Sequence, residues 1–230
     1  MSDFPLHQAC INNDLHMVQE LIENSENIKR DLTEKDIDGR TPLHWATSFQ
    51  YSEIIQLLLN NMKAIDLDNL KDDAGWTVFH IACSIGNLSI VEALYNRDIK
   101  PDLNLATSQG VTPLHLAVAK KYNDVVKFLI DNGASVRIKD KKGQIALHRA
   151  AAVGSMKLVE TLCQKNSPIN WADSNGWTPL FHALAEGHAD IAVGLVNQMG
   201  ADATIEDSNG LKAVDVSVND NVKQYFLKNI

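Results

Sequence analysis

The sequence has little of what disulfide-stapled, zinc-binding or membrane proteins need. Only three cysteines occur in 230 residues, Cys10, Cys83 and Cys163, and no two of them form a CxxC pair. No apolar run reaches the roughly 18 residues that a membrane helix requires, and the start, Met1–Pro5, lacks the basic and apolar regions of a signal peptide. We therefore expect reduced cysteines, no membrane contact, and a location in the cytoplasm and nucleus.

Sequence signatures of catalysis and phosphate binding are missing too. The chain contains no GxxxxGK[ST], GxGxxG, HExxH or GxSxG pattern, and no Cys or Ser has a recognisable base partner. The 21 basic and 29 acidic residues give a net charge of −8, which disfavours binding to nucleic acid through its phosphates. We expect no enzyme activity, no cofactor, no metal and no nucleic-acid partner.

An internal repeat organises the whole chain. Thr-Pro-Leu-His occurs at residues 41–44 and 112–115. Weaker copies of this motif place the position equivalent to its His at 7, 80, 148, 181 and 215. The successive spacings are 37, 36, 35, 33, 33 and 34, which is typical of the ankyrin repeat. One such unit cannot bury its apolar face, so units must stack. We predict an all-α ankyrin-repeat solenoid of seven helix-turn-helix repeats, with β-hairpin tips and a concave binding face.

Each part of the unit has a physical reason. A glycine five residues before the His position, in an Asp-rich context, predicts a tight hairpin tip. Thr41-Pro42 and Thr112-Pro113 predict the starts of inner helices, with Thr as N-cap and Pro as first helical residue. A second apolar stripe then predicts an outer helix. The single expected domain, 1–230, divides into repeats at 1–35, 36–71, 72–106, 107–139, 140–172, 173–206 and 207–230, with the first and last as caps.

The histidines are explained by the repeat. Five of the eight, at 7, 44, 80, 115 and 148, occupy the same position of successive units, which favours a structural role over metal binding. His182 and His188 are six residues apart and cannot share a helix face, so we expect both to be solvated. The extra residues between Asn96 and Asp102 are predicted to be a tolerated insertion.

Three tryptophans are candidates for partner contact. Trp76 and Trp177 each follow a tip glycine, where an exposed aromatic on a rigid scaffold favours partner binding over packing within the tip. Trp45 follows His44 on an inner helix, and for this residue the two interpretations are equally supported.

Charge is segregated along the chain. Residues 1–115 carry 8 basic and 17 acidic side chains, residues 116–170 carry 10 and 4, and residues 171–230 carry 3 and 8. Charged tips are usually only solvated, and tip Asp residues favour the turn itself. Segregation of charge by sign nevertheless indicates a surface that would bind one partner with the complementary charge pattern.

Several stretches resemble the gankyrin family over the full chain. They are Arg40–Ala46, Asp72–Trp76, Leu147–Ala151 and, similar to the yeast members, Gly176–His188. The resemblance implies a monomeric assembly chaperone of the proteasome regulatory particle that clasps the C-terminal domain of the third ATPase subunit of the ring. It also implies that the bound chaperone hinders docking onto the core particle. Leu184–Gly187 departs from the LxCxE-type stretch of the animal proteins, so retinoblastoma-protein binding is not implied.

The residues predicted to bind this partner are Asp36, Asp38, Arg40, Trp45, Phe49, Asp72, Asp73, Trp76, Lys120, Lys142, Arg149, Trp177 and Glu186. An alternative function is left open, in which the same face inhibits or recruits a signalling kinase or a transcription factor.

Overall fold

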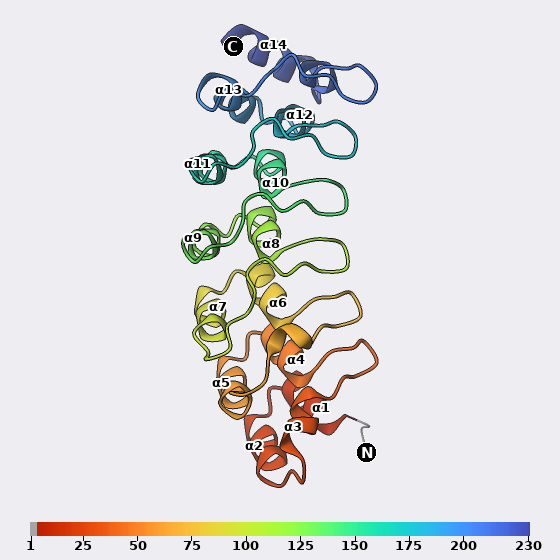
Figure 1. Ribbon diagram of the computed structural model, residues 1–230, viewed down its shortest axis with the longest axis vertical. Helices are drawn as coiled ribbons and strands as arrows, with labels where there is room; N and C mark the ends of the chain where they lie inside the picture. Colours follow the sequence, from red (N-terminus) through yellow and green to blue (C-terminus); the bar gives the residue numbers. More distant parts are fainter. Residues whose placement is uncertain (1–3) are drawn as a thin grey trace. The chain divides into compact units, whose positions relative to one another are not determined.

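The computed structural model describes residues 4–230 (Figure 1). These residues form two compact units. The N-terminal unit ends at Gln109 and the C-terminal unit begins at Gly110. Residues 4–230 contain helices and turns but no strand, and an isolated bridge pairs Glu206 with Lys212. No helix in this range is both long and apolar enough to cross a membrane. The prediction of a single domain over 1–230 stays a prediction.

The N-terminal unit consists of three helix pairs and two short additional helices. The pairs are α1 (Pro5–Ile11) with α2 (Leu15–Glu23), α4 (Pro42–Ser48) with α5 (Ser52–Asn61), and α6 (Val78–Ile85) with α7 (Leu88–Tyr95). The first helix of each pair is the inner one and the second is the outer one. Two short helices that the sequence pattern does not predict, α3 (Ile28–Thr33) and the 3₁₀ helix η1 (Leu67–Asn69), fill the longer connections before the next tips.

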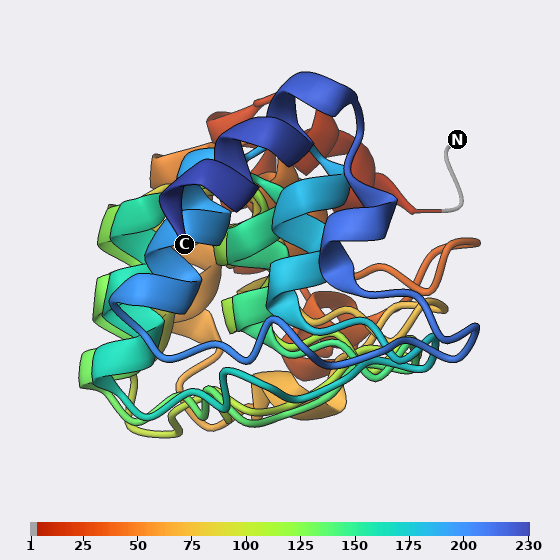
Figure 2. The same ribbon diagram turned by 90° about the horizontal axis from the view of Figure 1, so that it is seen from above.

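The C-terminal unit repeats the same pairing. Its pairs are α8 (Pro113–Ala119) with α9 (Asn123–Asp131), α10 (Ala146–Ala152) with α11 (Met156–Gln164), α12 (Pro179–Ala185) with α13 (Ala189–Asn197), and η2 (Ala213–Val216) with α14 (Asp220–Asn229). The last inner element is only a 3₁₀ turn, consistent with a decayed capping repeat. Within this unit the tips extend away from the outer helices α9, α11 and α13 (Figures 1 and 2).

The inner helices begin where the sequence predicts. Thr41 and Thr112 are N-caps, and the prolines that follow them occupy the first helical position. The core of each unit lies between inner and outer helices, where Leu43, Ile54 and Phe79 in one unit and Leu129 in the other are almost completely buried. Short helices become stable here because their apolar faces pack on one another.

The hairpin tips are turns built around an aspartate. The Asp140 N–H donates to the Gln144 main-chain oxygen at 2.9 Å, and Asp140 Oδ1 accepts from the N–H groups of Lys142 and Gln144. Gly143 completes the turn with φ +76°, a conformation that favours glycine. The same arrangement recurs at the tips headed by Asp36, Asp72, Asp173 and Asp207. The tip prediction is therefore confirmed as hydrogen-bonded turns without extended strands.

The repeated histidines connect each inner helix to the next tip. On four of them Nδ1 accepts the N–H of the residue that precedes the helix, as from Thr41 to His44 at 3.1 Å. Nε2 then donates to a main-chain oxygen further along the chain, which lies in the following repeat for all of them except His80, whose acceptor Leu105 comes just before the next tip. These pairs are His7 with Arg40 at 2.9 Å, His44 with Trp76 at 3.2 Å, His80 with Leu105 at 2.9 Å, His115 with Gln144 at 3.0 Å and His148 with Trp177 at 3.2 Å. The structural role predicted for these histidines is confirmed, and all of them except His80 hold the tip of the next repeat.

Candidate partner-binding face

The tips and inner helices of each unit form the surface that we call the tip–helix face. In three tips, the Oδ2 atom of the aspartate is hydrogen-bonded to the side chain nine residues later, on the inner helix of the same repeat. The pairs are Asp36 with Trp45 Nε1 at 2.6 Å, Asp140 with Arg149 Nη2 at 2.7 Å, and Asp173 with His182 Nε2 at 3.0 Å. Each tip therefore fixes the orientation of one large side chain on this face.

The ionisation of these carboxylates follows from the same contacts. Burial alone would raise the pKa of Asp140, but the Arg149 guanidinium and the main-chain N–H donors outweigh it and hold the pKa below its usual range. Burial likewise opposes ionisation of Asp173, and hydrogen bonds from His182, Gln144 and the main chain lower its pKa. These aspartates are charged elements of the scaffold.

In three repeats, the side chain of the residue after the tip glycine contacts the aspartate carboxylate of the next tip. Arg40 Nε lies 3.6 Å from Asp72 Oδ2, Gln144 Nε2 lies 3.2 Å from Asp173 Oδ2, and Trp177 Nε1 lies 3.1 Å from Asp207 Oδ2. Among the residues at this position that carry a side-chain donor, Trp76 is the exception, because the tip after it begins with Thr107, which has no carboxylate. Its indole nitrogen has no hydrogen-bond partner within residues 4–230.

Four residues of the second repeat form a stack on the face. The Arg40 guanidinium lies 4.7 Å from the centre of the Trp45 ring. Trp45 stacks on Phe49 with 6.2 Å between the ring centres, and Phe49 stacks on Tyr51 with 5.6 Å between the ring centres. Phe49 remains 45% exposed. For Trp45 both interpretations stay predictions, since its N–H is bound internally while the side chain is only partly buried.

A shallow cleft of about 280 Å³ lies beside this stack. Its lining residues are Arg40, Ser48, Asp72, Ala74, Trp76, Ile81, Ser84 and Ile85. Trp76 is half-buried, and its ring lies 6.2 Å from that of His80. The cleft thus combines an apolar wall with one opposite-charge pair and one unsatisfied donor.

The remaining predicted residues divide into exposed and internally bound groups. Asp38 and Asp73 are exposed at tips of the N-terminal unit, and Lys120, Lys142 and Glu186 are exposed in the C-terminal unit. Asp36, Asp72, Arg149 and Trp177 make the internal contacts described above, and Trp177 also stacks on Phe181 at 5.8 Å. The fold brings Asp36, Asp38, Arg40, Trp45, Phe49, Asp72, Asp73 and Trp76 together in one unit, and Lys120, Lys142, Arg149, Trp177 and Glu186 belong to the other.

The prediction that His182 and His188 are solvated is wrong. His182 is bound to Asp173 and its ring lies 5.3 Å from that of Trp177. The His188 ring lies against Gly154 and hydrogen-bonds the Ala152 oxygen at 3.1 Å through Nε2. The nine-residue spacing from a tip Asp is the sequence signal that could have placed His182.

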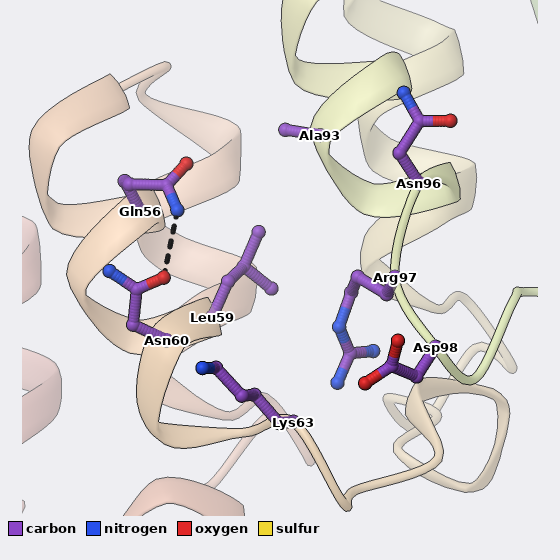
Figure 3. A pocket seen from close by; sticks show the side chains of 8 residues that line it. All are labelled: Gln56, Leu59, Asn60, Lys63, Ala93, Asn96, Arg97 and Asp98. Carbon is purple, nitrogen blue, oxygen red and sulfur yellow. Dashed lines mark hydrogen bonds between the residues drawn. The ribbon is translucent and has the colours of Figure 1, made fainter.

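The insertion between residues 96 and 102 has a structural role. Arg97 Nη2 donates to the main-chain oxygens of Met62 at 2.5 Å and Ile65 at 3.0 Å, where α5 ends. Figure 3 shows the Arg97 guanidinium beside Lys63 and Asp98, in a cleft of about 330 Å³ at the ends of α5 and α7. Arg97 thus supplies a donor to two main-chain oxygens just beyond the end of α5, and the Met62 oxygen also accepts the Ile65 N–H.

No cluster of three or more His, Cys, Asp or Glu side chains suited to a metal ion occurs among residues 4–230. Burial raises the pKa of the Cys10 thiol to about 12 and that of Cys163 to about 11, and it also raises that of Cys83. All three are free thiols, and such pKa values keep them protonated near neutral pH.

The paired short helices, glycine-closed tips and histidine contacts define a protein of the ankyrin-repeat class. Ankyrin repeats match residues 2–70, 63–140 and 132–207. The chain is 58% identical over 231 residues to the Saccharomyces cerevisiae protein named "Probable 26S proteasome regulatory subunit p28", with 100% of both chains covered. The chain therefore belongs to the ankyrin repeat family and, within it, to the group that includes this yeast protein.

Two further similarities extend the comparison. An ankyrin repeat-containing protein of Schizosaccharomyces pombe is 41% identical over 219 residues, covering 92% of this chain and 88% of the relative. The solved ankyrin repeat domain of Bcl-3, a member of the IkappaB protein family, superposes with a TM-score of 0.80 at 26% identity, covering 98% and 99% of the two chains. These similarities confirm the ankyrin-repeat fold over nearly the whole chain.

Proposed function

We propose that this chain is an assembly chaperone of the proteasome regulatory particle. It binds the C-terminal domain of one ATPase subunit, the third of the ring, through the tip–helix face, and it hinders premature docking on the core particle. The observation that carries this proposal is the 58% identity, over the full length of both chains, to the protein named as a 26S proteasome regulatory subunit.

The chemistry of the face is suited to a protein partner. A partly exposed aromatic stack, a cleft with an apolar wall and a rim of exposed charges make up the usual anatomy of such an interface. Asp38 and Asp73 would meet basic groups of the ATPase domain, and Lys120 and Lys142 would meet acidic ones. We further propose that the chain acts as a monomer in the cytoplasm and nucleus.

The test is a calorimetric titration of the purified chain with each isolated C-terminal domain of the regulatory-particle ATPases. The proposal expects one-to-one binding to the third subunit and none to the others. The bound ATPase should then fail to dock on added core particle, and docking should recover when the chain is removed. The alternative function would be favoured if no ATPase domain bound and a kinase or transcription factor were recovered with the chain from cells.

A further inference from the structure

Trp76 and Trp177 occupy the same position of different repeats but use their indole N–H groups differently. Trp177 donates to Asp207 Oδ2 at 3.1 Å. The other oxygen, Asp207 Oδ1, holds its own tip by accepting from the N–H groups of Asn209 and Leu211. The Trp177 donor is thus satisfied inside the protein.

The third repeat lacks the acceptor that would do the same for Trp76. The next tip begins with Thr107, whose single side-chain oxygen accepts from the Gln109 N–H at 3.3 Å. Threonine can therefore serve the turn, but it has no second oxygen to offer an indole. The Trp76 nitrogen has no partner among the described residues, and it is also not one of the atoms shielded from solvent.

An exposed N–H that is covered on binding must find a new acceptor. Otherwise its lost contact with water opposes association. Trp76 lines the cleft beside the aromatic stack, so a partner that fills the cleft must supply that acceptor.

The charge around the cleft decides which acceptor fits. The Arg40 guanidinium is balanced by Asp72 at 3.6 Å and also lies over the Trp45 ring. Asp73 is exposed on the same tip as Asp72, and its charge would repel an incoming carboxylate. The surroundings therefore favour an oxygen without charge.

We infer that the Trp76 indole N–H donates to an uncharged carbonyl oxygen of the ATPase domain, from its backbone or from an amide side chain. Thr107 determines this specificity indirectly, because an Asp at that position would occupy the indole from within the chain. The inference rests on the proposed function and names one contact that the function would require.

Three variants of the full chain test it against the C-terminal domain of the third ATPase. Trp76→Phe keeps most of the ring and removes the donor, so affinity should fall about three- to tenfold. Thr107→Asp supplies an internal acceptor and should cause a similar fall. Trp177→Phe makes the same change where the donor is already bound to Asp207, so it should lower the affinity of the folded fraction less than Trp76→Phe does.

The double variant that combines Trp76→Phe with Thr107→Asp separates the proposed cause from a general effect of the new charge. If Thr107→Asp acts by occupying the indole, it should add little to the loss already caused by Trp76→Phe. An equal loss in both backgrounds would overturn the role of Thr107. The loss from Trp76→Phe should also be the same at low and high ionic strength, and a loss that disappears at high salt would identify a charged acceptor and overturn the inference.

Failure of the inference and failure of the proposed function give different results. A wild-type chain that does not bind the ATPase domain removes the function itself. A wild-type chain that binds, together with a Trp76→Phe variant of equal affinity, removes only the inferred hydrogen bond.

Discussion

The imidazole of His148 donates through Nε2 to the main-chain oxygen of Trp177, 3.2 Å away in the next repeat. Its other nitrogen accepts the Ile145 N–H at 3.1 Å. The two contacts need a neutral ring with its proton on Nε2, because a protonated Nδ1 could not accept. Protonation of this ring therefore breaks the link between a helix start and the following tip.

Stability should consequently fall as the pH drops below 6.5. Burial, the main cause, lowers the pKa values of His44, His115 and His148 from 6.5 to about 4. Between these values the unfolded chain binds protons that the folded chain does not. The folded state then loses roughly 1.4 kcal/mol per pH unit for each histidine. The full contribution is present above pH 6.5.

Urea denaturation at pH 7 and pH 5 measures this effect, and unfolding at pH 5 should take up about three protons. The tip carboxylates do not interfere in this window, because the pKa values of Asp140 and Asp173 lie below 3.8 and their contribution is lost only at lower pH. Equal midpoints at pH 7 and pH 5 would contradict the neutral, buried state of these rings.

Gly110→Val should destabilise the C-terminal unit by more than about 1 kcal/mol. Gly110 has φ +76°, and a Cβ there would lie 2.9 Å from the Lys141 nitrogen. Gly210 has φ +77° with nothing within 4 Å of its added Cβ, so Gly210→Val is the matched control for backbone strain alone. Urea midpoints should show the larger loss for Gly110→Val, and equal losses would mean that contact with the next tip contributes nothing.

Trp76→Ala should weaken binding to the ATPase domain about thirtyfold, because truncating an aromatic interface residue costs about 2 kcal/mol. Its thermal midpoint should change little. For Trp177→Ala the expected change is a loss of stability. It removes the hydrogen bond to Asp207 and the stacking on Phe181, so its midpoint should fall. A lower midpoint for Trp76→Ala with wild-type affinity of the folded fraction would make Trp76 a packing residue.

Reversing Asp38 and Asp73 to Lys should slow association with the ATPase domain and flatten its dependence on ionic strength, since exposed rim charges act mainly on the association rate. Both side chains are exposed, so the circular dichroism spectrum should stay native. Glu20→Lys with Glu53→Lys makes the same change in net charge on exposed positions of the outer helices α2 and α5. If both double variants associate equally fast at low salt, the acidic tips lie outside the interface.

The parts of the fold set by neighbouring residues could be predicted from the sequence. The starts of α4 and α8 follow from Thr41-Pro42 and Thr112-Pro113, because capping depends on residues three or four positions apart. The contact of Arg97 with Met62 spans 35 residues and depends on how α7 ends beside α5. A local pattern carries no signal for such a contact.

The candidate site shows the same division. The repeat places Trp76 and Trp177 at equivalent positions, so the local pattern predicts the same role for both. The difference between them lies one repeat away, in Thr107 and Asp207. A comparison of each residue after a tip glycine with the first residue of the next tip is enough to separate the two tryptophans by sequence alone.

The most direct test of the account is to purify the tagged chain from cells that express it and to identify by mass spectrometry what accompanies it. We expect regulatory-particle ATPases, with the third subunit of the ring present in one-to-one ratio, and no core-particle subunits. Recovery of kinases or DNA-binding factors without proteasomal ATPases, or of fully assembled capped proteasomes, would contradict it.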